Sequence, residues 1–311
     1  MHSYISFALL FIIVLITFVL LLIGFIHLLT GKSFLHILKE LKYELIYNVV
    51  GFSALFDDWV LRHKNIATDL PIGTGRNALI TGGARGIGAE VVKSLLQHDL
   101  HVIIACRNVE AGKNLYKQLR QEGVTTGSVD VQKLDLESLN SVRSFAKIIK
   151  EKYNKIHILI NNAGKMFGPF ERTIDGYESQ LATNYLGHFL LTHLLMPEII
   201  AAGEPKRYAR IVNVSSCAHV VGTINFEDMN LEKQYISSKA YAQSKLAQTV
   251  WEGSVSIVYT SLGILLERAT GVYISNCQIT PMGSLAYSTN LQKKLFDFTN
   301  NLLGIDEFGK Q

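Results

Sequence analysis

A glycine-rich stretch, residues 81–88, constrains the fold of this chain more than any other feature. It reads Thr-Gly-Gly-Ala-Arg-Gly-Ile-Gly and is called the glycine turn below. The apolar run 77–81 is typical of a buried strand, and the residues after the turn carry apolar side chains at helical spacing. A strand, a glycine turn and a helix direct backbone N–H groups and the positive end of a helix towards a pyrophosphate. The alternative is a tight turn without a ligand, since the spacing is Gly-x-x-x-Gly-x-Gly rather than Gly-x-Gly-x-x-Gly.

Strands and helices alternate from residue 76 onward. Alternation of this kind predicts an α/β fold in which helices cover both faces of a parallel sheet. The expected strands are continuous apolar runs, as in sheets buried on both faces. The chain is therefore predicted to form a Rossmann-type doubly wound sheet. The predicted strands are 77–81, 101–106, 129–134, 157–161 and 210–215, and the predicted helices are 87–98, 109–122, 137–153 and 176–202.

The first 31 residues predict a membrane anchor. Residues 4–31 contain no charged side chain, which is longer than the roughly 20 residues needed to span a bilayer. A cleaved secretory signal is the alternative, but a basic region before the apolar core and a small-residue cleavage site are both missing. Lys32, Lys39 and Lys42 follow the segment, so the positive-inside rule places the rest of the chain in the cytosol.

The segment that follows is mixed in character. Residues 34–61 are rich in apolar and aromatic side chains interrupted by charges, which predicts either an interfacial helix or a plain connecting helix. Pro71, Gly73 and Gly75 then indicate a linker. The predicted organisation is an anchor (1–31), an amphipathic and linker segment (32–75), a catalytic domain (76–276) and a C-terminal tail with a helix (277–311).

Arg107 bears on the choice of cofactor. It lies nineteen residues beyond Gly88, at the end of the second predicted strand, where NAD-binding folds of this type usually carry an acidic residue. An arginine there accommodates a 2′-phosphate instead, and Arg85 in the glycine turn can reach the same group. The pattern favours NADP(H) over NAD(H). A solvated surface arginine is the alternative.

Two further strand ends carry polar residues. Asp135 follows the third strand, where it could accept a hydrogen bond from an adenine amine or cap the next helix. The sequence Asn-Asn-Ala-Gly, residues 161–164, ends the fourth strand. Its small residues would let a cofactor approach the backbone, and its asparagines could tie neighbouring strand ends together.

A serine, a tyrosine and a lysine form the strongest constellation. Ser215 and Ser216 end the fifth strand, and Tyr241 and Lys245 follow at the i, i+4 spacing that places two side chains on one helix face. An ammonium beside a phenol favours the phenolate, so Lys245 is expected to lower the pKa of Tyr241. A bare Tyr-x-x-x-Lys is common, but here it follows the other motifs in order.

In combination these motifs resemble the short-chain dehydrogenase/reductase family, and within it the membrane-anchored, retinol-dehydrogenase-like branch. The resemblance covers residues 76 to about 248 and includes Asn-Tyr-Leu-Gly-His-Phe at 184–189. It implies that Tyr241 is the acid/base, that Ser216 holds the substrate oxygen, and that Lys245 binds the nicotinamide ribose. It also implies that Asn184 anchors a water. The residues expected at the cofactor are Gly82, Ala84, Arg85, Gly86, Ile87, Gly88, Arg107, Asn108, Asp135, Leu136, Asn162, Ala163, Gly164, Tyr241 and Lys245.

The sequence departs from the family after Lys245. The family continues with a sixth strand that ends in Pro-Gly, yet here residues 246–249 run straight into Trp251 and Gly253. Residues 252–276 resemble the family's later helix and last strand, and 291–305 its C-terminal helix. The economical interpretation is an internal deletion after residue 248 that removes the sixth strand. Such a loss would leave a sheet edge unpaired or draw the last strand into the gap.

The expected activity is interconversion of an alcohol and a carbonyl on a lipophilic substrate by a membrane-anchored oxidoreductase. A formal charge of +4 without a Lys/Arg cluster argues against nucleic acid, and the ten histidines lack metal-ligand spacing. The endoplasmic reticulum is the expected membrane, and a homodimer is left open. The alternative is a catalytically impaired splice or gene-model variant that binds nucleotide at most weakly.

Overall fold

A computed structural model describes residues 33–61, 71–205, 207–251, 272–275 and 278–310, together with residues 24, 28 and 31. The chain divides into two compact units, Met1–Phe52 and Ser53–Gln311. The predicted membrane segment, residues 4–31, lies outside the described residues except for three positions. Within the part of the chain that the structure describes, no helix combines the length and apolar character that crossing a bilayer requires.

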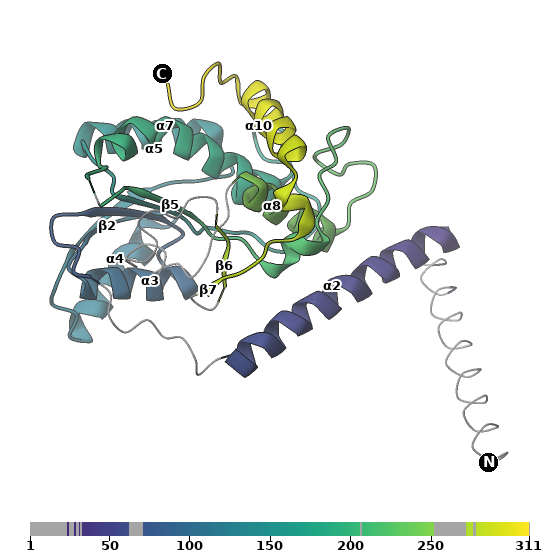
Figure 1. The fold of residues 1–311 in the computed structure, drawn as a ribbon, viewed down its shortest axis with the longest axis horizontal. Helices are drawn as coiled ribbons and strands as arrows, with labels where there is room; N and C mark the ends of the chain where they lie inside the picture. Colours follow the sequence, from purple (N-terminus) through teal and green to yellow (C-terminus); the bar gives the residue numbers. More distant parts are fainter. Residues whose placement is uncertain are drawn as a thin grey trace, which may run out of the picture. The chain divides into compact units, whose positions relative to one another are not determined.

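The larger unit is built on a parallel sheet of five strands (Figure 1). The strands are β1 (Asn77–Thr81), β2 (His101–Cys106), β3 (Ser128–Lys133), β4 (Ile158–Asn161) and β5 (Arg210–Asn213), arranged in the order β3-β2-β1-β4-β5. The order reverses between β1 and β4, and in open α/β sheets ligands bind at such a switch point, beyond the carboxyl ends of the strands. All five strands lie within two residues of their predicted bounds.

Helices cover both faces of the sheet. Successive residues of a strand point to opposite faces, so the apolar strands supply side chains to a hydrophobic core on each side. Ile80, Ile104 and Ile160 pack in one core with α3 (Gly86–Gln97) and α4 (Val109–Gln121). Leu79, Ile103 and Leu159 pack in the other core with α5 (Leu139–Lys152) and α7 (Gly187–Ala201). These strand residues are fully buried. The predicted doubly wound α/β architecture is confirmed.

The predicted helix 176–202 is divided into three parts. It begins as α6 (Ser179–Leu181), passes through a π-helical turn, η1 (Ala182–Leu186), and continues as α7. The amide N–H of Gly187 accordingly donates to the carbonyl of Ala182, five residues back. Insertions of this kind occur frequently at functional sites, and this one contains Asn184.

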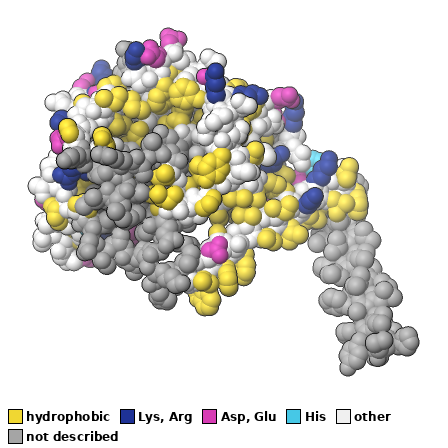
Figure 2. All heavy atoms as spheres, in the orientation of Figure 1, with side chains coloured by type: hydrophobic (Ala, Val, Ile, Leu, Met, Phe, Trp, Pro, Cys, Tyr) yellow, Lys and Arg dark blue, Asp and Glu magenta, His cyan; other side chains and the backbone are white. Residues whose placement is uncertain are grey.

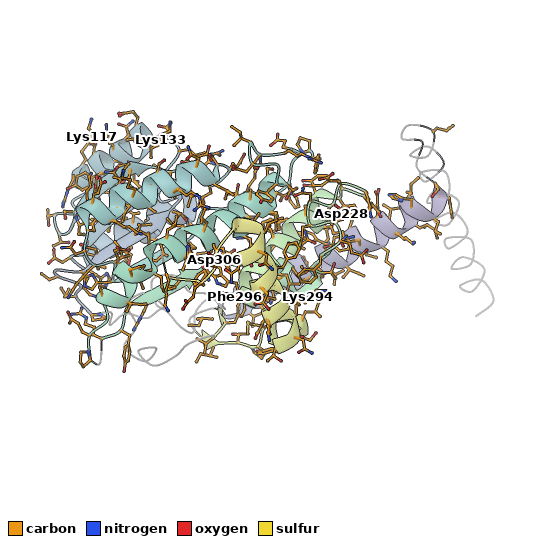
Figure 3. All side chains as sticks on the ribbon, turned by 90° about the horizontal axis from the view of Figure 1, so that it is seen from above. Lys117, Lys133, Asp228, Lys294, Phe296 and Asp306 are labelled. Atoms are coloured by element: carbon orange, nitrogen blue, oxygen red, sulfur yellow. The ribbon has the colours of Figure 1, made fainter. Side chains whose placement is uncertain are left out.

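The C-terminal part packs on the helix that carries Tyr241 and Lys245. After a short 3₁₀ turn, η2 (Cys217–Val221), that helix is α8 (Ser237–Trp251), and it contacts η4 (Ser284–Tyr287) and α10 (Thr289–Leu303). An aromatic cluster joins α7 and α8 to the C-terminus: the ring centroid of Phe189 lies 5.1 Å from Trp251, 5.8 Å from Phe296 and 4.9 Å from Phe308. Figure 3 shows Phe296 and Lys294 on α10. The predicted C-terminal helix is therefore present.

The expected last strand is not part of the main sheet. Within the predicted segment 271–276, residues Ile274–Ser275 form β6, which pairs antiparallel with β7 (Gln278–Ile279) as a separate two-stranded sheet. Of the two outcomes expected from the loss of a sixth strand, the described residues show the unpaired edge, because β6 does not join β5. Among the described residues, β5 has a strand neighbour on one side only, as expected for a sheet that lacks a sixth strand. Residues 252–271 lie outside the description.

Residues 34–61 form one continuous helix, α2 (Phe34–Leu61), as both sequence interpretations required. Figure 2 shows hydrophobic side chains along it, and Leu35 is 62%, Phe52 72% and Trp59 68% exposed. His36 Nε2 lies 3.2 Å from Oε1 of Glu40, one helical turn later. An exposed apolar surface is what an interfacial helix would present, and the choice between it and a plain connecting helix stays a prediction.

The hydroxyl of Thr81 at the end of β1 yields a prediction about stability. Its Oγ accepts the backbone N–H groups of Asn162 (3.0 Å) and Ala163 (2.9 Å), and Thr81 is completely buried. Thr81→Val would remove the acceptor of the Ala163 N–H, whereas the Asn162 N–H would keep the Ile160 carbonyl at 3.0 Å, so we expect the free energy of unfolding to fall by about 1–3 kcal/mol in urea titrations of the full chain. Thr81→Ser keeps the hydroxyl and should lose less than half as much. Equal losses in the two variants would show that shape, not hydrogen bonding, matters here.

Candidate active site

The glycine turn brings backbone close to backbone at the end of β1. Gly82 (φ +67°) and Gly86 (φ +56°) adopt left-handed conformations that favour glycine. A Cβ on Gly82 would lie 2.9 Å from the Cα of Ala163, and one on Gly88 would lie 2.4 Å from the carbonyl oxygen of Gly82. Helix α3 begins at Gly86 and has no acidic residue in its first turn. This cradle leaves the positive end of a helix open to an anion, so it fits a pyrophosphate.

The residues expected at the cofactor phosphate lie on the rim of this cradle. Arg85 is exposed, precedes α3 and makes no side-chain capping bond. Ala84 is half-buried, whereas Ile87 is 69% exposed. Arg107 follows β2 with its side chain 64% exposed, and its Nη1 lies 3.5 Å from Glu137 Oε1. Asn108 uses its side chain to cap α4, accepting the N–H of Ala111 at 3.1 Å.

Asp135 and Leu136 follow β3 on the same edge. Asp135 Oδ1 accepts the N–H of Glu137 at 3.0 Å, which closes a tight turn before α5. The N-cap of α5 is Ser138, so the capping role that sequence left open for Asp135 belongs to another residue. Leu136 is buried against Gly187, where a Cβ would lie 2.8 Å from the carbonyl oxygen of Leu136.

The sequence Asn-Asn-Ala-Gly at 161–164 ties three strand ends together. Asn161 Nδ2 donates to Asn213 Oδ1 at 2.7 Å, which joins β4 to β5. Asn162 Nδ2 donates to the carbonyl of Thr81 at 2.8 Å, which joins β4 to β1. Gly164 lies beside the helix residues, since a Cβ there would be 3.5 Å from Asn184 Oδ1 and 3.7 Å from Lys245 Nζ. The expected tying role of the asparagines is what the hydrogen bonds show.

Asn184 is held by two segments at once. Its side chain accepts the N–H of Lys165 at 2.8 Å and donates to the Lys165 carbonyl at 2.9 Å and to Ser244 Oγ at 2.8 Å. Its carbonyl oxygen lies 3.2 Å from Nδ1 of His188. The π-helical turn therefore fixes the loop after β4 against α8.

Ser216, Tyr241 and Lys245 come together between β5 and α8. Ser216 begins the 3₁₀ turn after β5, and its Oγ accepts the N–H of Ala218 at 3.2 Å. Lys245 Nζ lies 5.9 Å from the centroid of the Tyr241 ring, and it donates to the carbonyl of Val214 (2.7 Å) and to Gln248 Oε1 (3.0 Å). Lys245 is 3% exposed, so its ammonium depends on these acceptors.

The protonation of this group differs from the expectation. Burial raises the pKa of Tyr241 above its usual range, and this outweighs the lowering by a hydrogen bond with Ser216. Burial also lowers the pKa of Lys245 to about 7. Lys245 therefore does not bring the Tyr241 pKa towards neutrality in this structure, because desolvation disfavours both charged forms. The phenol is protonated at neutral pH.

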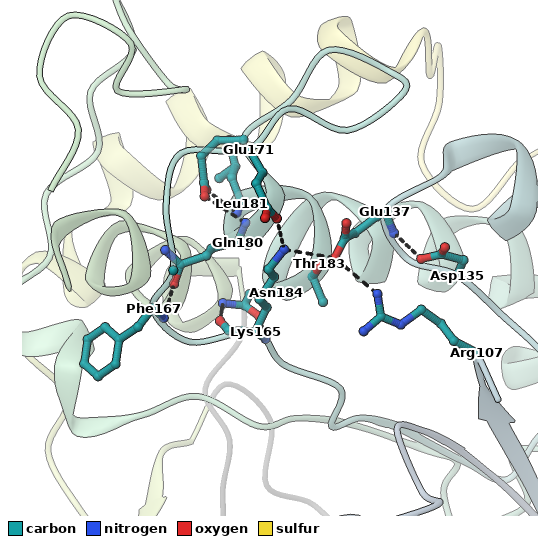
Figure 4. Close-up of polar contacts among 12 residues, drawn as sticks. Arg107, Asp135, Glu137, Lys165, Phe167, Glu171, Gln180, Leu181, Thr183 and Asn184 are labelled. Atoms are coloured by element: carbon teal, nitrogen blue, oxygen red, sulfur yellow. Dashed lines mark hydrogen bonds and ion pairs between the residues drawn. The ribbon is translucent and has the colours of Figure 1, made fainter. Parts of the chain in front are cut away.

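The site also contains residues that the motifs did not identify. Glu137 directly follows Asp135-Leu136, and its Oε1 lies 3.5 Å from Arg107 Nη1, 3.5 Å from Lys165 Nζ and 3.4 Å from Thr183 Oγ1 (Figure 4). Gln248 links Lys245 to Asn161, donating to its carbonyl at 3.4 Å. The sequence did contain a signal for Glu137 and Lys165, because each is a charged residue directly after a strand-end motif: Glu137 follows Asp135-Leu136, and Lys165 follows Asn-Asn-Ala-Gly.

A further site residue to which the sequence analysis gave no role is the histidine of the Asn-Tyr-Leu-Gly-His-Phe motif. His188 is fully buried, and its Nε2 lies 2.8 Å from Thr81 Oγ1. Because the Asn184 carbonyl can only accept, Nδ1 carries the proton of the neutral ring, and Nε2 is left to accept from the Thr81 hydroxyl. His188 thus joins β1 to the π-helical turn as a neutral ring.

Comparisons with known proteins identify relatives of this chain. A family model described as short chain dehydrogenase matches residues 76–261. Polyprenol dehydrogenase of Danio rerio is 32% identical over 323 residues, covering 85% of this chain and 99% of the relative. Retinol dehydrogenase 12 of Bos taurus is 33% identical over 280 residues, covering 74% of this chain and 87% of the relative. A crystal structure of an uncharacterized Mycobacterium paratuberculosis protein superposes with a TM-score of 0.60 at 29% identity, covering 77% and 97% of the two chains.

The alignment with the zebrafish protein also bears on the length of the chain. It runs over 323 positions, more than the 311 residues present here, while it takes up only 85% of this chain. Positions of the relative therefore lack a counterpart in this chain. This agrees with the shortening inferred from the residues that follow Lys245.

His188 gives a prediction about pH. Burial lowers its pKa from 6.5 to about 3, so the folded chain binds fewer protons than the unfolded chain at mildly acidic pH. Its stabilising contribution is complete above pH 6.5 and is lost as the pH falls, by about 1.4 kcal/mol per pH unit between about 6 and 3. Other histidines with lowered pKa values add to this slope in the full chain, so the test is a comparison. In urea titrations from pH 7.5 to 5, His188→Asn should reduce the slope below pH 6 by about 1.4 kcal/mol per pH unit. An unchanged slope would place the acid sensitivity elsewhere.

Proposed function

The chain belongs to the short-chain dehydrogenase/reductase family, and from that premise we propose that it is a membrane-anchored, NADP(H)-dependent oxidoreductase. It interconverts an alcohol and a carbonyl on a lipophilic substrate of the retinoid, steroid or polyprenol type. The observation that carries the proposal is the convergence of Ser216, Tyr241 and Lys245 on the sheet edge where the glycine turn opens.

The side chains divide the chemistry between them. Tyr241 gives its proton to the carbonyl oxygen of the substrate, and its raised pKa keeps that proton available at neutral pH. Ser216 orients the same oxygen and stabilises the charge that develops on it. Lys245 binds the nicotinamide ribose, and Asn184 anchors a water that connects Lys245 with solvent. The nicotinamide, when bound, supplies or accepts the hydride.

The cofactor contacts follow the rim of the glycine turn. Gly82, Gly86 and Gly88 approach the pyrophosphate, with Ala84 and Ile87 beside them. Arg85 and Arg107 hold the 2′-phosphate, since two guanidiniums suit a dianion. Asp135 and Leu136 face the adenine from the third strand. The proposed remainder of the cofactor site consists of Asn108, Asn162, Ala163 and Gly164.

Three observations support a lipophilic substrate at a membrane. Residues 4–31 carry no charge, α2 exposes apolar side chains, and the relatives are named for retinol and polyprenol, both apolar alcohols. A single span in the endoplasmic reticulum, with the catalytic domain in the cytosol, accounts for the lysines after residue 31. A substrate dissolved in the bilayer would then reach the site from the membrane surface.

The shortened chain favours one rival. Positions present in the zebrafish relative are missing here, and Lys245 Nζ already has two acceptors in Val214 and Gln248. A chain that binds nucleotide weakly and turns over nothing would fit these observations. The active enzyme and the impaired variant differ in whether a substitution of a catalytic residue changes turnover.

Tyr241→Phe separates them. The full chain in detergent should bind NADPH, seen as enhanced nicotinamide fluorescence, and should reduce retinal or a polyprenal. In Tyr241→Phe we expect kcat/KM to fall by at least about 100-fold, because the proton donor is lost, while NADPH affinity changes less than about twofold. Binding without turnover in the unsubstituted chain would identify the impaired variant. Turnover that survives in Tyr241→Phe would remove tyrosine from its role.

Arg107 tests the cofactor preference. Arg107→Leu removes a charge-assisted pair to the 2′-phosphate, so we expect NADPH affinity to weaken by about tenfold or more and NADH affinity by less than about twofold. Lys93→Met, which breaks the ion pair with Glu122 on the protein surface, is the matched loss of a cation and should change neither. Equal affinities for the two cofactors in the unsubstituted chain would exclude an NADP(H) preference.

A further inference from the structure

Glu137 stands between the two ends of the proposed cofactor site. One of its oxygens, Oε1, faces three donors: Arg107 Nη1 from the end of β2, Lys165 Nζ from the loop after β4, and Thr183 Oγ1 from the π-helical turn. Figure 4 shows the carboxylate with Arg107 on one side and Lys165 and Thr183 on the other. Its side chain is 25% exposed, so it is partly withdrawn from solvent.

The Arg107 contact is the one that can be exchanged. The Arg107 side chain is 64% exposed and reaches Glu137 with a single nitrogen at 3.5 Å, a geometry in which an ion pair contributes little. A phosphate dianion offers a guanidinium two short, charge-assisted bonds. Arg107 would therefore leave Glu137 for a 2′-phosphate, whereas a 2′-hydroxyl gives it no comparable reason to move.

Release of Arg107 would leave a carboxylate beside a second anion unless other donors held it. Lys165 is placed to do so, because both its backbone N–H and its carbonyl are bonded to the Asn184 side chain, at 2.8 and 2.9 Å. Its ammonium lies 2.5 Å from Glu171 and 3.5 Å from Glu137, so it serves both carboxylates. Thr183 supplies a further donor to the same oxygen of Glu137.

We propose that Glu137 is a residue that determines cofactor specificity: its carboxylate engages Arg107 before the cofactor binds and is held by Lys165 and Thr183 once Arg107 turns to the 2′-phosphate. This inference rests on the proposed NADP(H)-dependent function. Glu137 opposes NADPH binding chiefly because its negative charge remains near the phosphate, while breaking its single 3.5 Å contact with Arg107 costs little. Lys165 counteracts that opposition.

The test compares NADPH and NADH affinities of full-chain variants by nicotinamide fluorescence, which needs no turnover. We expect Glu137→Gln to tighten NADPH binding by about three- to tenfold, because it removes the competing charge but keeps an acceptor for Thr183. NADH affinity should not improve. Lys165→Met should weaken NADPH binding by about threefold or more, and Glu137→Gln combined with it should restore the affinity.

The controls separate local charge from net charge and from folding. Glu122→Gln removes a carboxylate from the ion pair with Lys93 and should leave the ratio of the two affinities unchanged. The gain in Glu137→Gln should shrink in 0.5 M salt, because part of the site is exposed to solvent. Thermal melting establishes that each variant is folded, and Lys165→Met carries the test if Glu137→Gln is not.

Each outcome decides between the claims. Failure of the unsubstituted chain to bind either cofactor would overturn the proposed function itself. If the unsubstituted chain binds NADPH but Glu137→Gln leaves the ratio of NADPH affinity to NADH affinity unchanged or lowers it, only the role of Glu137 is overturned. Loss of NADPH affinity in Lys165→Met that persists in the double variant would show that Lys165 contacts the cofactor directly, against the arrangement proposed here.

Discussion

The arrangement of the site depends on one buried hydroxyl at the carboxyl end of β1. Thr81 Oγ1 accepts two backbone N–H groups from the loop after β4 and lies within hydrogen-bonding distance of His188. Through these bonds the glycine turn, the Asn-Asn-Ala-Gly loop and the π-helical turn are held in one geometry. None of the three segments has a regular structure that would fix it independently, because each lies beyond a strand or interrupts a helix. A side-chain hydrogen bond therefore replaces the sheet ladder where the sheet ends.

Burial has a different consequence further along the same edge. Lys245 and Tyr241 lie in a region where desolvation disfavours charge, so the lysine is held by the carbonyl of Val214 and by Gln248, and the phenol stays protonated. At the outer rim, by contrast, the Arg107 side chain is largely exposed to solvent. The site thus grades from a dry centre, suited to proton transfer, to a solvated rim, suited to exchange of one anion for another.

Periodicity and glycine spacing were sufficient to predict the framework from the sequence. All five strands and the helices between them lie within two or three residues of their expected bounds. β1, β2 and β4 are buried and largely apolar runs, as expected for a parallel sheet covered on both faces. β3 is the exception, because its sequence Ser-Val-Asp-Val-Gln-Lys is largely polar and only partly buried. The π-helical turn could not be predicted, since the apolar pattern of 176–202 continues through it. Contacts between distant charges were missed for another reason. Glu137 and Lys165 lie 28 positions apart and meet only because β3 and β4 end on the same edge of the sheet.

The missing segment affects the cofactor half and the substrate half of the proposed site differently. The cofactor half is built from the ends of β1 to β4, and Gln248, which holds Lys245 and Asn161, precedes the inferred deletion. The substrate half depends on what covers Ser216. There His219 accepts the N–H of Gly283 at 3.0 Å through Nε2, while its Nδ1 lies 2.6 Å from the carbonyl of Ser216. The C-terminal segment is thereby tied to the loop of Ser216, although β6 and β7 do not extend the sheet. We therefore expect the shortening to change the shape of the substrate pocket, and with it the range of substrates, more than it changes the binding of the cofactor.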